Sequence, residues 1–140
     1  VQLTQHNDEM GASSIALAVA LKTLGLDVEF FTETDPDKQL LEIQFYQKAQ
    51  ELKVPVHEYP LSYTDIQKSV DKGLFVIVFY DTLEGVGNHS LIYEINEKEI
   101  SFFDSFDAMS KEVFEQQRRV EGICQQVIVI DDRNFVMRHS

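Results

Sequence analysis

The sequence lacks the features that mark membrane, secreted and metal-binding chains. No apolar run approaches the length of a membrane span, and no signal-peptide pattern opens the chain. The single cysteine excludes an internal disulfide and a cysteine-rich metal site. It also suits a reducing compartment, so we expect a cytoplasmic location. No HExxH or similar spacing supplies metal ligands, and we expect neither a metal nor another cofactor.

Basic residues are also scarce. The chain has 12 Lys and Arg against 24 Asp and Glu, and its formal net charge is -12. An acidic surface repels the phosphates of nucleic acids and of anionic lipids. We therefore expect no nucleic-acid partner and no membrane insertion by this chain.

Repeats, low-complexity segments and Pro/Gly-rich linkers are absent from the sequence as well. With 140 residues and 44% apolar content, the chain is long enough to bury a sizeable core. Residues 1–140 are therefore expected to form a single domain.

Apolar periodicity and boundary residues predict four helices. The segment 11–25 is Ala-rich and apolar on nearly every side, which predicts a buried helix. A second helix over 35–53 opens with Asp and Pro, and a third over 62–73 opens with Ser62, a favourable N-cap. A short amphipathic helix is expected over 110–119.

The predicted strands lie mostly side by side in the second half of the chain. The run LFVIVFYD, 74–81, is continuously apolar, as expected for a central strand that is covered on both faces. Further extended segments are expected at 26–31, 54–60, 88–95, 99–104 and 124–131. Helices followed by adjacent strands indicate an α+β fold with helices packed on an antiparallel sheet.

A hairpin of 88–95 and 99–104 would bring a histidine and an aspartate together. A two-residue loop at positions 96–97 places His89 opposite Asp104, a four-residue loop with the same centre gives the same pairing, and an odd-length loop makes the pairing diagonal. A carboxylate beside a histidine fixes the imidazole tautomer and stabilises the imidazolium. It should raise the pKa of His89, whereas burial acts in the opposite direction.

Other interpretations of these polar residues stay open. A His–Asp pair at a strand end can be a purely structural hydrogen bond. Asp107 is a second acid in the following turn. Solvated or packing roles are expected for His6, His57 and His139, because none of them lies in a metal-ligand or catalytic spacing.

Three segments together resemble the C39-like cysteine peptidases, a papain-like family. One of them, 49–80, resembles the stretch before the family's histidine strand. NDEMGASSIALAVALKTLG, 7–25, resembles the family's D-C-G-x-A-(S/C)-L helix, with Met10 at the Cys position and Gly11 at the Gly. NHSLIYEINEKEISFFDS, 88–105, resembles its His-strand and Asp segment, so that His89 and Asp104 match the family's pair. The resemblance implies a papain-like fold in which an N-terminal buried helix packs on an antiparallel sheet. It also implies a cleft between helix 11–24 and the His hairpin, to which Gln5, Gly11 and Asn88 are assigned as binding residues.

The sequence departs from this family at the nucleophile. Met10 carries a thioether, which has no ionisable proton and cannot act as a thiolate. No Gln lies at the usual oxyanion spacing, since Thr4 is six residues before Met10 and Gln5 is one residue closer. Ser105 replaces the common Pro after the Asp. These departures predict a chain without peptidase activity.

The other candidate nucleophiles are weaker. Ser13 and Ser14 lie one turn further along the helix, where their hydroxyls are expected to point elsewhere and to bond the helix or a neighbour. Cys124 is expected to be buried and unreactive, as free cysteines usually are.

A second alignment with the same family places 11–31 on a later helix of longer members. The family's Cys helix would then be expected upstream of Val1. The first alignment is favoured, since the separation of Met10 from His89 is about that of the family's Cys and His.

Three functions follow. The leading one is a non-catalytic C39-like domain that binds a peptide or partner protein in the remnant cleft. Such domains in this family can precede transporters, so association with a transporter or other domain is expected. The alternatives are an active cysteine hydrolase whose nucleophile helix lies upstream, and a structural assembly domain without a ligand.

Overall fold

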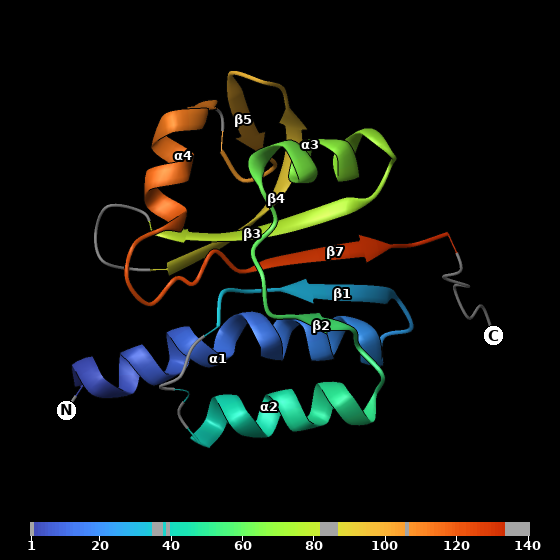
Figure 1. Cartoon of the computed structure of the whole chain (residues 1–140), viewed down its shortest axis with the longest axis vertical. Helices are drawn as coiled ribbons and strands as arrows, with labels where there is room; N and C mark the ends of the chain where they lie inside the picture. Colours follow the sequence, from blue (N-terminus) through green and yellow to red (C-terminus); the bar gives the residue numbers. More distant parts are fainter. Residues whose placement is uncertain (1, 35–37, 39, 82–86, 106, 134–140) are drawn as a thin grey trace.

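The computed structural model describes residues 2–34, 38, 40–81, 87–105 and 107–133, and of residues 2–12 the helical backbone alone. Figure 1 shows the elements. In chain order they are α1 (Gln2–Thr23), β1 (Asp27–Phe31), α2 (Leu40–Glu51), β2 (Val56–His57), α3 (Tyr63–Asp71), β3 (Phe75–Asp81), β4 (Gly87–Ile95), β5 (Glu99–Phe102), β6 (Met109–Ser110), α4 (Lys111–Arg118) and β7 (Val127–Asp131).

The strands form one mixed sheet with the order β2-β1-β7-β3-β4-β5-β6. The expected α+β class is confirmed. The strands that were expected in an antiparallel sheet, 74–80, 88–95, 99–104 and 124–131, do pair antiparallel. The sheet as a whole is mixed, because β2 lies parallel to β1. The chain between these two strands passes through α2, and such a crossover returns the second strand in the direction of the first.

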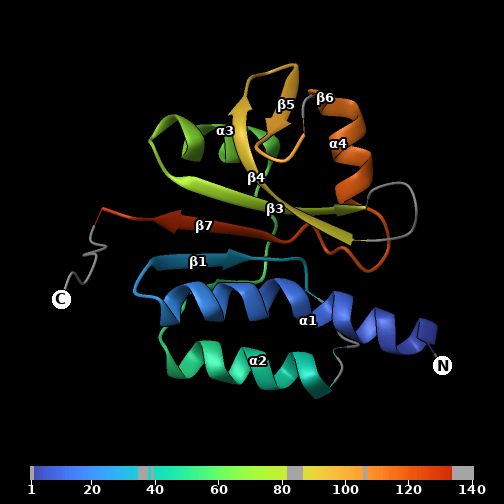
Figure 2. The same cartoon turned by 180° about the vertical axis from the view of Figure 1, so that it is seen from behind.

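Helices cover both faces of this sheet (Figures 1 and 2), with α1 and α2 on one face and α3 and α4 on the other. Side chains alternate between the two faces along each strand, so the core has two parts, one on each face of the sheet. Phe30 and Ile128 pack beneath α1, together with Ile15 and Ala18 of that helix. On the opposite face the core contains Val76, Val78, Tyr80, Ile92, Phe102 and Phe114.

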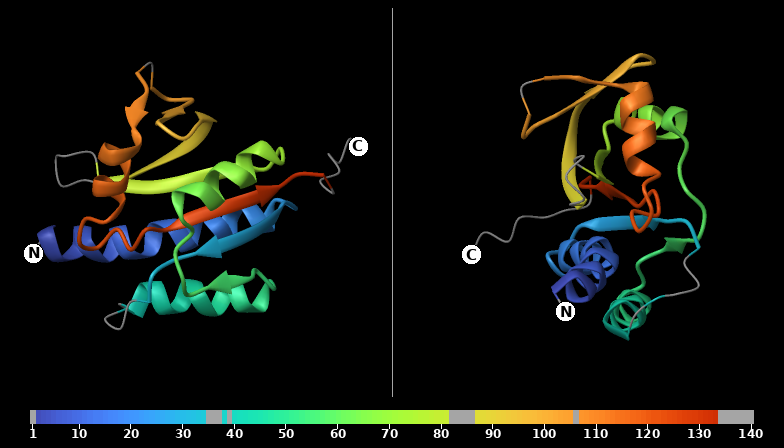
Figure 3. Two further views of the ribbon diagram at one scale, coloured as in Figure 1. Left: turned by 45° about the horizontal axis from the view of Figure 1, so that its top comes forward. Right: turned by 90° about the vertical axis from the view of Figure 1, so that its left-hand side faces the viewer.

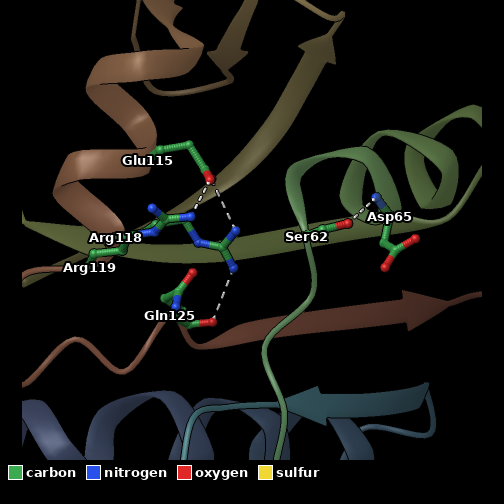
Figure 4. A network of polar contacts seen from close by, with 6 residues as sticks. All are labelled: Ser62, Asp65, Glu115, Arg118, Arg119 and Gln125. Carbon is green, nitrogen blue, oxygen red and sulfur yellow. Dashed lines mark hydrogen bonds and ion pairs between the residues drawn. The ribbon is translucent and has the colours of Figure 1, made fainter.

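The predicted helix boundaries are confirmed where a capping residue sets them. Ser62 Oγ accepts a hydrogen bond from Asp65 N at 3.1 Å at the start of α3, and Figure 4 shows this contact. Gly25 follows α1 with φ of 103°, and Gly73 follows α3 with φ of 88°. A side chain is rarely tolerated at such angles, which explains why both helices end at glycine. The start of α1 was not predicted, because the helix begins at Gln2 rather than at residue 11.

The apolar run at 74–81 is the central strand that its composition predicted. As β3 it lies between β7 and β4. Val76 and Val78 are essentially fully buried on the α3 and α4 face. This strand therefore holds the two halves of the sheet together and positions β4.

The β4–β5 hairpin differs from its predicted register. Asn96 Oδ1 accepts hydrogen bonds from the backbone N–H groups of Lys98 and Glu99, at 2.8 and 3.0 Å, so the turn is centred on residues 97–98 rather than 96–97. Ile95 pairs with Ile100, and an irregularity between residues 92 and 94 changes the register again before Ile92 pairs with Phe102. Figure 3 shows the hairpin bending away from the layer of α1 and α2.

Candidate functional site

His89 lies on β4 and faces helix α1. Its Nε2 atom lies 2.6 Å from Ser14 Oγ of that helix. The imidazole stacks on Phe79 of β3, with ring centroids 4.4 Å apart and planes inclined by 16°. Phe79 is the cross-strand partner of His89, so both rings belong to the face of the sheet that α1 covers.

Burial lowers the pKa of His89 from its ordinary value of 6.5 to about 4. Transfer of an imidazole from water to an apolar site disfavours its charged form, and burial is the one resolved cause of this shift. His89 is therefore neutral near pH 7. The sequence-based expectation that Asp104 would raise this pKa is wrong, because the carboxylate does not oppose the effect of burial.

Asp104 is exposed and lies at the opposite face of the sheet. Its Oδ2 atom accepts a hydrogen bond of 3.1 Å from Ser90 Oγ. Asn88 Nδ2 donates to Tyr80 Oη at 3.1 Å and to Ser90 Oγ at 3.0 Å. The predicted binding residue Asn88 thus belongs to the network of Asp104 and not to the surroundings of His89.

The predicted pairing of His89 with Asp104 is therefore wrong, and the hairpin register is the reason. Continued from the pair Ile92–Phe102, the register places Asp104 beside Ser90, not beside His89. Successive residues of a strand point to opposite faces, so a shift of one position moves a side chain to the other side of the sheet. Whether either residue acts in catalysis stays a prediction.

Three of the predicted site residues, Met10, Gly11 and Gln5, lie on α1 within the segment whose side chains are outside the described residues. The predicted approach of the Met10 sulfur to the imidazole falls there as well. Ser14 lies four residues, about one turn, after Met10. Ser14 Oγ contacts His89. The expectation that this hydroxyl would bond the helix or a neighbour is therefore confirmed for a neighbour, and the expectation that it would point elsewhere than toward the histidine is wrong.

A sequence signal for Ser14 did exist. Ser14 precedes Ala18 by four residues, and Ile15 and Val19 have the same spacing. Residues at this spacing share one helix face. All four are buried, and Ser14 is only 1% exposed. A hydroxyl within the buried stripe of α1 needs a partner from the sheet, because an unpaired buried hydroxyl is costly.

Further buried polar side chains gather at the same end of the sheet. Continuing the registers by one residue places Thr32, Gln126, Phe79 and His89 in one row across β1, β7, β3 and β4. Asp81 ends β3 two residues beyond Phe79. Among the described side chains, Asp81 Oδ1 and Gln126 Oε1 are buried oxygens without a hydrogen-bond partner.

Thr32, Asp81 and Gln126 were not predicted as a group, because each is an isolated polar residue in the sequence. Thr32 and Asp81 follow the apolar stretches of β1 and β3, and Gln126 precedes that of β7. Only the antiparallel pairing of β1 and β3 with β7 brings the three positions to one end of the sheet.

On the other face, α4 contributes a buried arginine. Arg118 is 1% exposed and its guanidinium donates to Glu115 Oε1 and to the carbonyl oxygen of Gln125, each at 3.3 Å. Figure 4 shows the carboxylate of Glu115 above the two arginines and in contact with both, with Gln125 below them. Burial lowers the pKa of Arg118, and Glu115 opposes that effect. This network ties α4 to the segment that leads into β7.

The remaining sequence candidates lie apart from His89. His57 Nε2 lies 2.8 Å from Glu29 Oε2, and its ring stacks on Phe31 with centroids 4.6 Å apart. Cys124 is partly buried, and its carbonyl oxygen accepts a hydrogen bond from Glu33 N at 2.9 Å. Within the described part of the chain, His, Cys, Asp and Glu side chains form no group of three that could hold a metal ion.

The Ser14–His89 hydrogen bond joins α1 to β4 and has the features of a structural contact. A neutral imidazole with a pKa near 4 is a poor general base for activating a hydroxyl near pH 7. Ser14 lies inside a helix of 22 residues, where the backbone N–H groups are bonded within the helix. The backbone N–H groups around Ser14 are therefore not available to stabilise an oxyanion.

None of the helices in the described ranges is long and apolar enough to cross a membrane. Comparison of the chain with protein-family models, with curated proteins and with solved structures gave no match.

Proposed function

We propose that this chain is a non-catalytic, C39-like domain that binds a peptide or partner protein. The observation that carries the proposal is the hydrogen bond between Ser14 and His89. It occupies Nε2 of the imidazole with a hydroxyl group that lies within the buried stripe of α1. A cysteine thiol activated by a histidine gives its proton to a ring nitrogen, and this contact already occupies one of the two.

Two further features support a loss of catalysis. His89 and Asp104 lie on opposite faces, so the carboxylate cannot orient the ring or stabilise an imidazolium. Met10 replaces the thiol that the family resemblance requires. Each of these features removes a different part of the catalytic arrangement.

The hairpin that carries His89 also carries a surface suited to a protein partner. Tyr93 and Phe103 are 63% and 60% exposed and contact one another edge to face, with centroids 5.0 Å apart. We call Tyr93 and Phe103 the hairpin surface. Exposed aromatic rings are typical of contacts with another chain.

The net charge of the chain indicates what charge a partner should carry. The formal net charge of the chain is -12. Charge complementarity favours a partner that presents an apolar side chain flanked by Lys or Arg.

Selection of peptides from a random display library against the folded chain tests this proposal. Selected peptides should be enriched in basic and apolar residues. Binding should fall about tenfold or more for Tyr93→Ala and Phe103→Ala, because exposed aromatic anchors dominate such contacts. Leu24→Ala is the matched control, since Leu24 is 69% exposed and lies at the end of α1.

Hydrolysis is measured on the same peptides and on Gly-Gly-containing leader peptides by mass spectrometry. The substrates should stay intact with the unmodified chain. Thiol-dependent turnover by that chain would refute the proposal. If the selected peptides bind Tyr93→Ala and Phe103→Ala as tightly as the unmodified chain, the hairpin surface is not the binding site.

A further inference from the structure

A second site lies at the other end of the sheet from His89. A pocket of about 440 Å³ opens where β1 and β3 begin and β7 ends. Lys22, Lys53, Lys72 and Arg133 line it, together with three acidic residues. In the whole chain acidic residues outnumber basic residues by 24 to 12, so this lining reverses the local balance of charge.

The fold explains how cationic side chains from distant segments meet here. Lys22 belongs to the last turn of α1, Lys53 follows the end of α2, and Lys72 caps α3. Lysines at these positions complement the negative ends of helix dipoles, which is their ordinary structural role. That role requires each lysine to lie near its own helix end. It does not require the three to line one cavity.

The backbone of Lys53 has an unusual conformation. Its φ is 63°, the left-handed conformation that glycine or asparagine usually adopts after a helix. A lysine therefore occupies a position where the backbone alone would favour a smaller residue.

The acidic residues of the lining already have cationic or proton-donating partners. Asp27 Oδ1 lies 3.8 Å from Lys22 Nζ, and Glu29 Oε2 lies 2.8 Å from the Nε2 atom of His57. Asp131 accepts two hydrogen bonds from Nε of Arg133, at 2.9 and 3.1 Å. The Asp131 pKa is lowered to about 2, first by these hydrogen bonds.

Two lysines remain after this pairing. In the described ranges, Lys53 and Lys72 have no ion-pair partner. The lining also contains the apolar residues Val28, Pro55, Leu74 and Val129. Apolar side chains beside charged groups suit a ligand that has both an aliphatic part and a charged part.

We propose that this pocket binds a small organic anion. Lys53 and Lys72 hold its oxyanion group, a carboxylate or a phosphate, and the apolar walls hold an aliphatic body. An ammonium is a point-charge donor that suits both oxyanions. The site is independent of the hairpin surface, and its ligand need not be a peptide.

Titrations followed by two-dimensional ¹H–¹⁵N NMR test the proposal with hexanoate, hexyl phosphate and hexylammonium as probes. Hexanoate, hexyl phosphate or both should shift the amide signals of Lys53, Lys72 and Leu74, and hexylammonium should not. The probe that binds more tightly identifies the preferred oxyanion. Inorganic phosphate, which lacks the aliphatic body, should bind more weakly than hexyl phosphate.

The decisive variant is Lys53→Asn with Lys72→Gln, because asparagine tolerates the backbone conformation at position 53. Affinity for the anionic probe should fall about tenfold or more, the value expected for loss of charge-assisted hydrogen bonds. The matched control is Lys48→Gln with Lys68→Gln. It removes two lysines from the same helices but outside the lining, and should leave the affinity unchanged.

Three results would overturn the proposal. The first is equal binding of hexanoate, hexyl phosphate and hexylammonium. The second is an affinity that falls equally in the pocket variant and in the control. The third is a set of shifted amides spread over the whole surface. A folded-state spectrum of each variant, recorded without probe, shows that the compared proteins share the same structure.

Discussion

Acidification should destabilise this protein through His89 in particular. The imidazole is neutral in the folded state down to a pKa of about 4, whereas in the unfolded chain it takes up a proton near its ordinary value of 6.5. Between these two values the unfolded state binds more protons, so the free energy of unfolding rises with pH. The contribution of His89 is complete above the unfolded pKa and is lost as pH falls toward the folded one.

The size of the effect follows from the difference in pKa. Each unit corresponds to about 1.4 kcal/mol, so the change from neutral pH to the folded-state pKa is about 3 kcal/mol. That is a large part of the total of about 5–15 kcal/mol that typical domains possess. Carboxylates titrate over part of the same range, so the contribution of His89 must be isolated by comparison with a variant.

The comparison uses His89→Gln, which keeps a polar side chain opposite Ser14 but cannot be protonated. Urea unfolding followed by circular dichroism at several pH values between 7 and 4 gives the free energy of unfolding of both proteins. The unmodified chain should lose about 3 kcal/mol more than the variant over that range. His57→Gln is the matched control and should keep the part of the pH dependence that His89 causes, because it leaves His89 in place.

Two results would refute the reasoning about His89. One is a pair of parallel stability curves for the unmodified chain and His89→Gln. The other is an imidazole of His89 that titrates in the folded protein near 6.5, as measured by NMR of the ring carbons.

Three further predictions concern single contacts. Ser14→Ala should lower the free energy of unfolding by about 1–3 kcal/mol, because it leaves the partly buried His89 without its hydroxyl partner, and urea unfolding at pH 7 measures this loss. Asp104→Asn should leave the pKa of His89 unchanged in an NMR titration. A change in that pKa would show that Asp104 interacts with His89, contrary to the hairpin register. Ser62→Ala and Ser110→Ala should each cost about 1 kcal/mol in thermal or urea unfolding, since both hydroxyls cap helices, and a neutral result would show that these caps do not stabilise the fold.

The order of the secondary elements was largely predictable because their signals are local. The continuous apolar run 74–81 became the central strand β3, and the N-cap at Ser62 began a helix as expected. The two-residue strand β6 was missed, since so short a segment carries no periodicity. The parallel pairing of β2 was also missed, because it depends on where the chain returns after α2.

The candidate site was predictable only in part. His89 was expected near the start of a strand and lies there, but its partner was misassigned. The turn centred on 97–98 and the irregularity between residues 92 and 94 together change the register of the hairpin. Neither leaves a clear mark in the sequence, and a change of one position is enough to exchange the two faces of a strand.

The sequence by itself determined the acidic character of the chain, the absence of a thiol at position 10 and the succession of helices and strands. These properties follow from composition and from neighbouring residues. Only the tertiary structure decided which face His89 occupies, that its pKa is lowered, and that lysines from three helix ends line one pocket. The physical reason is distance along the chain. Ser14 and His89 are 75 positions apart, and their contact exists only because α1 packs across the sheet.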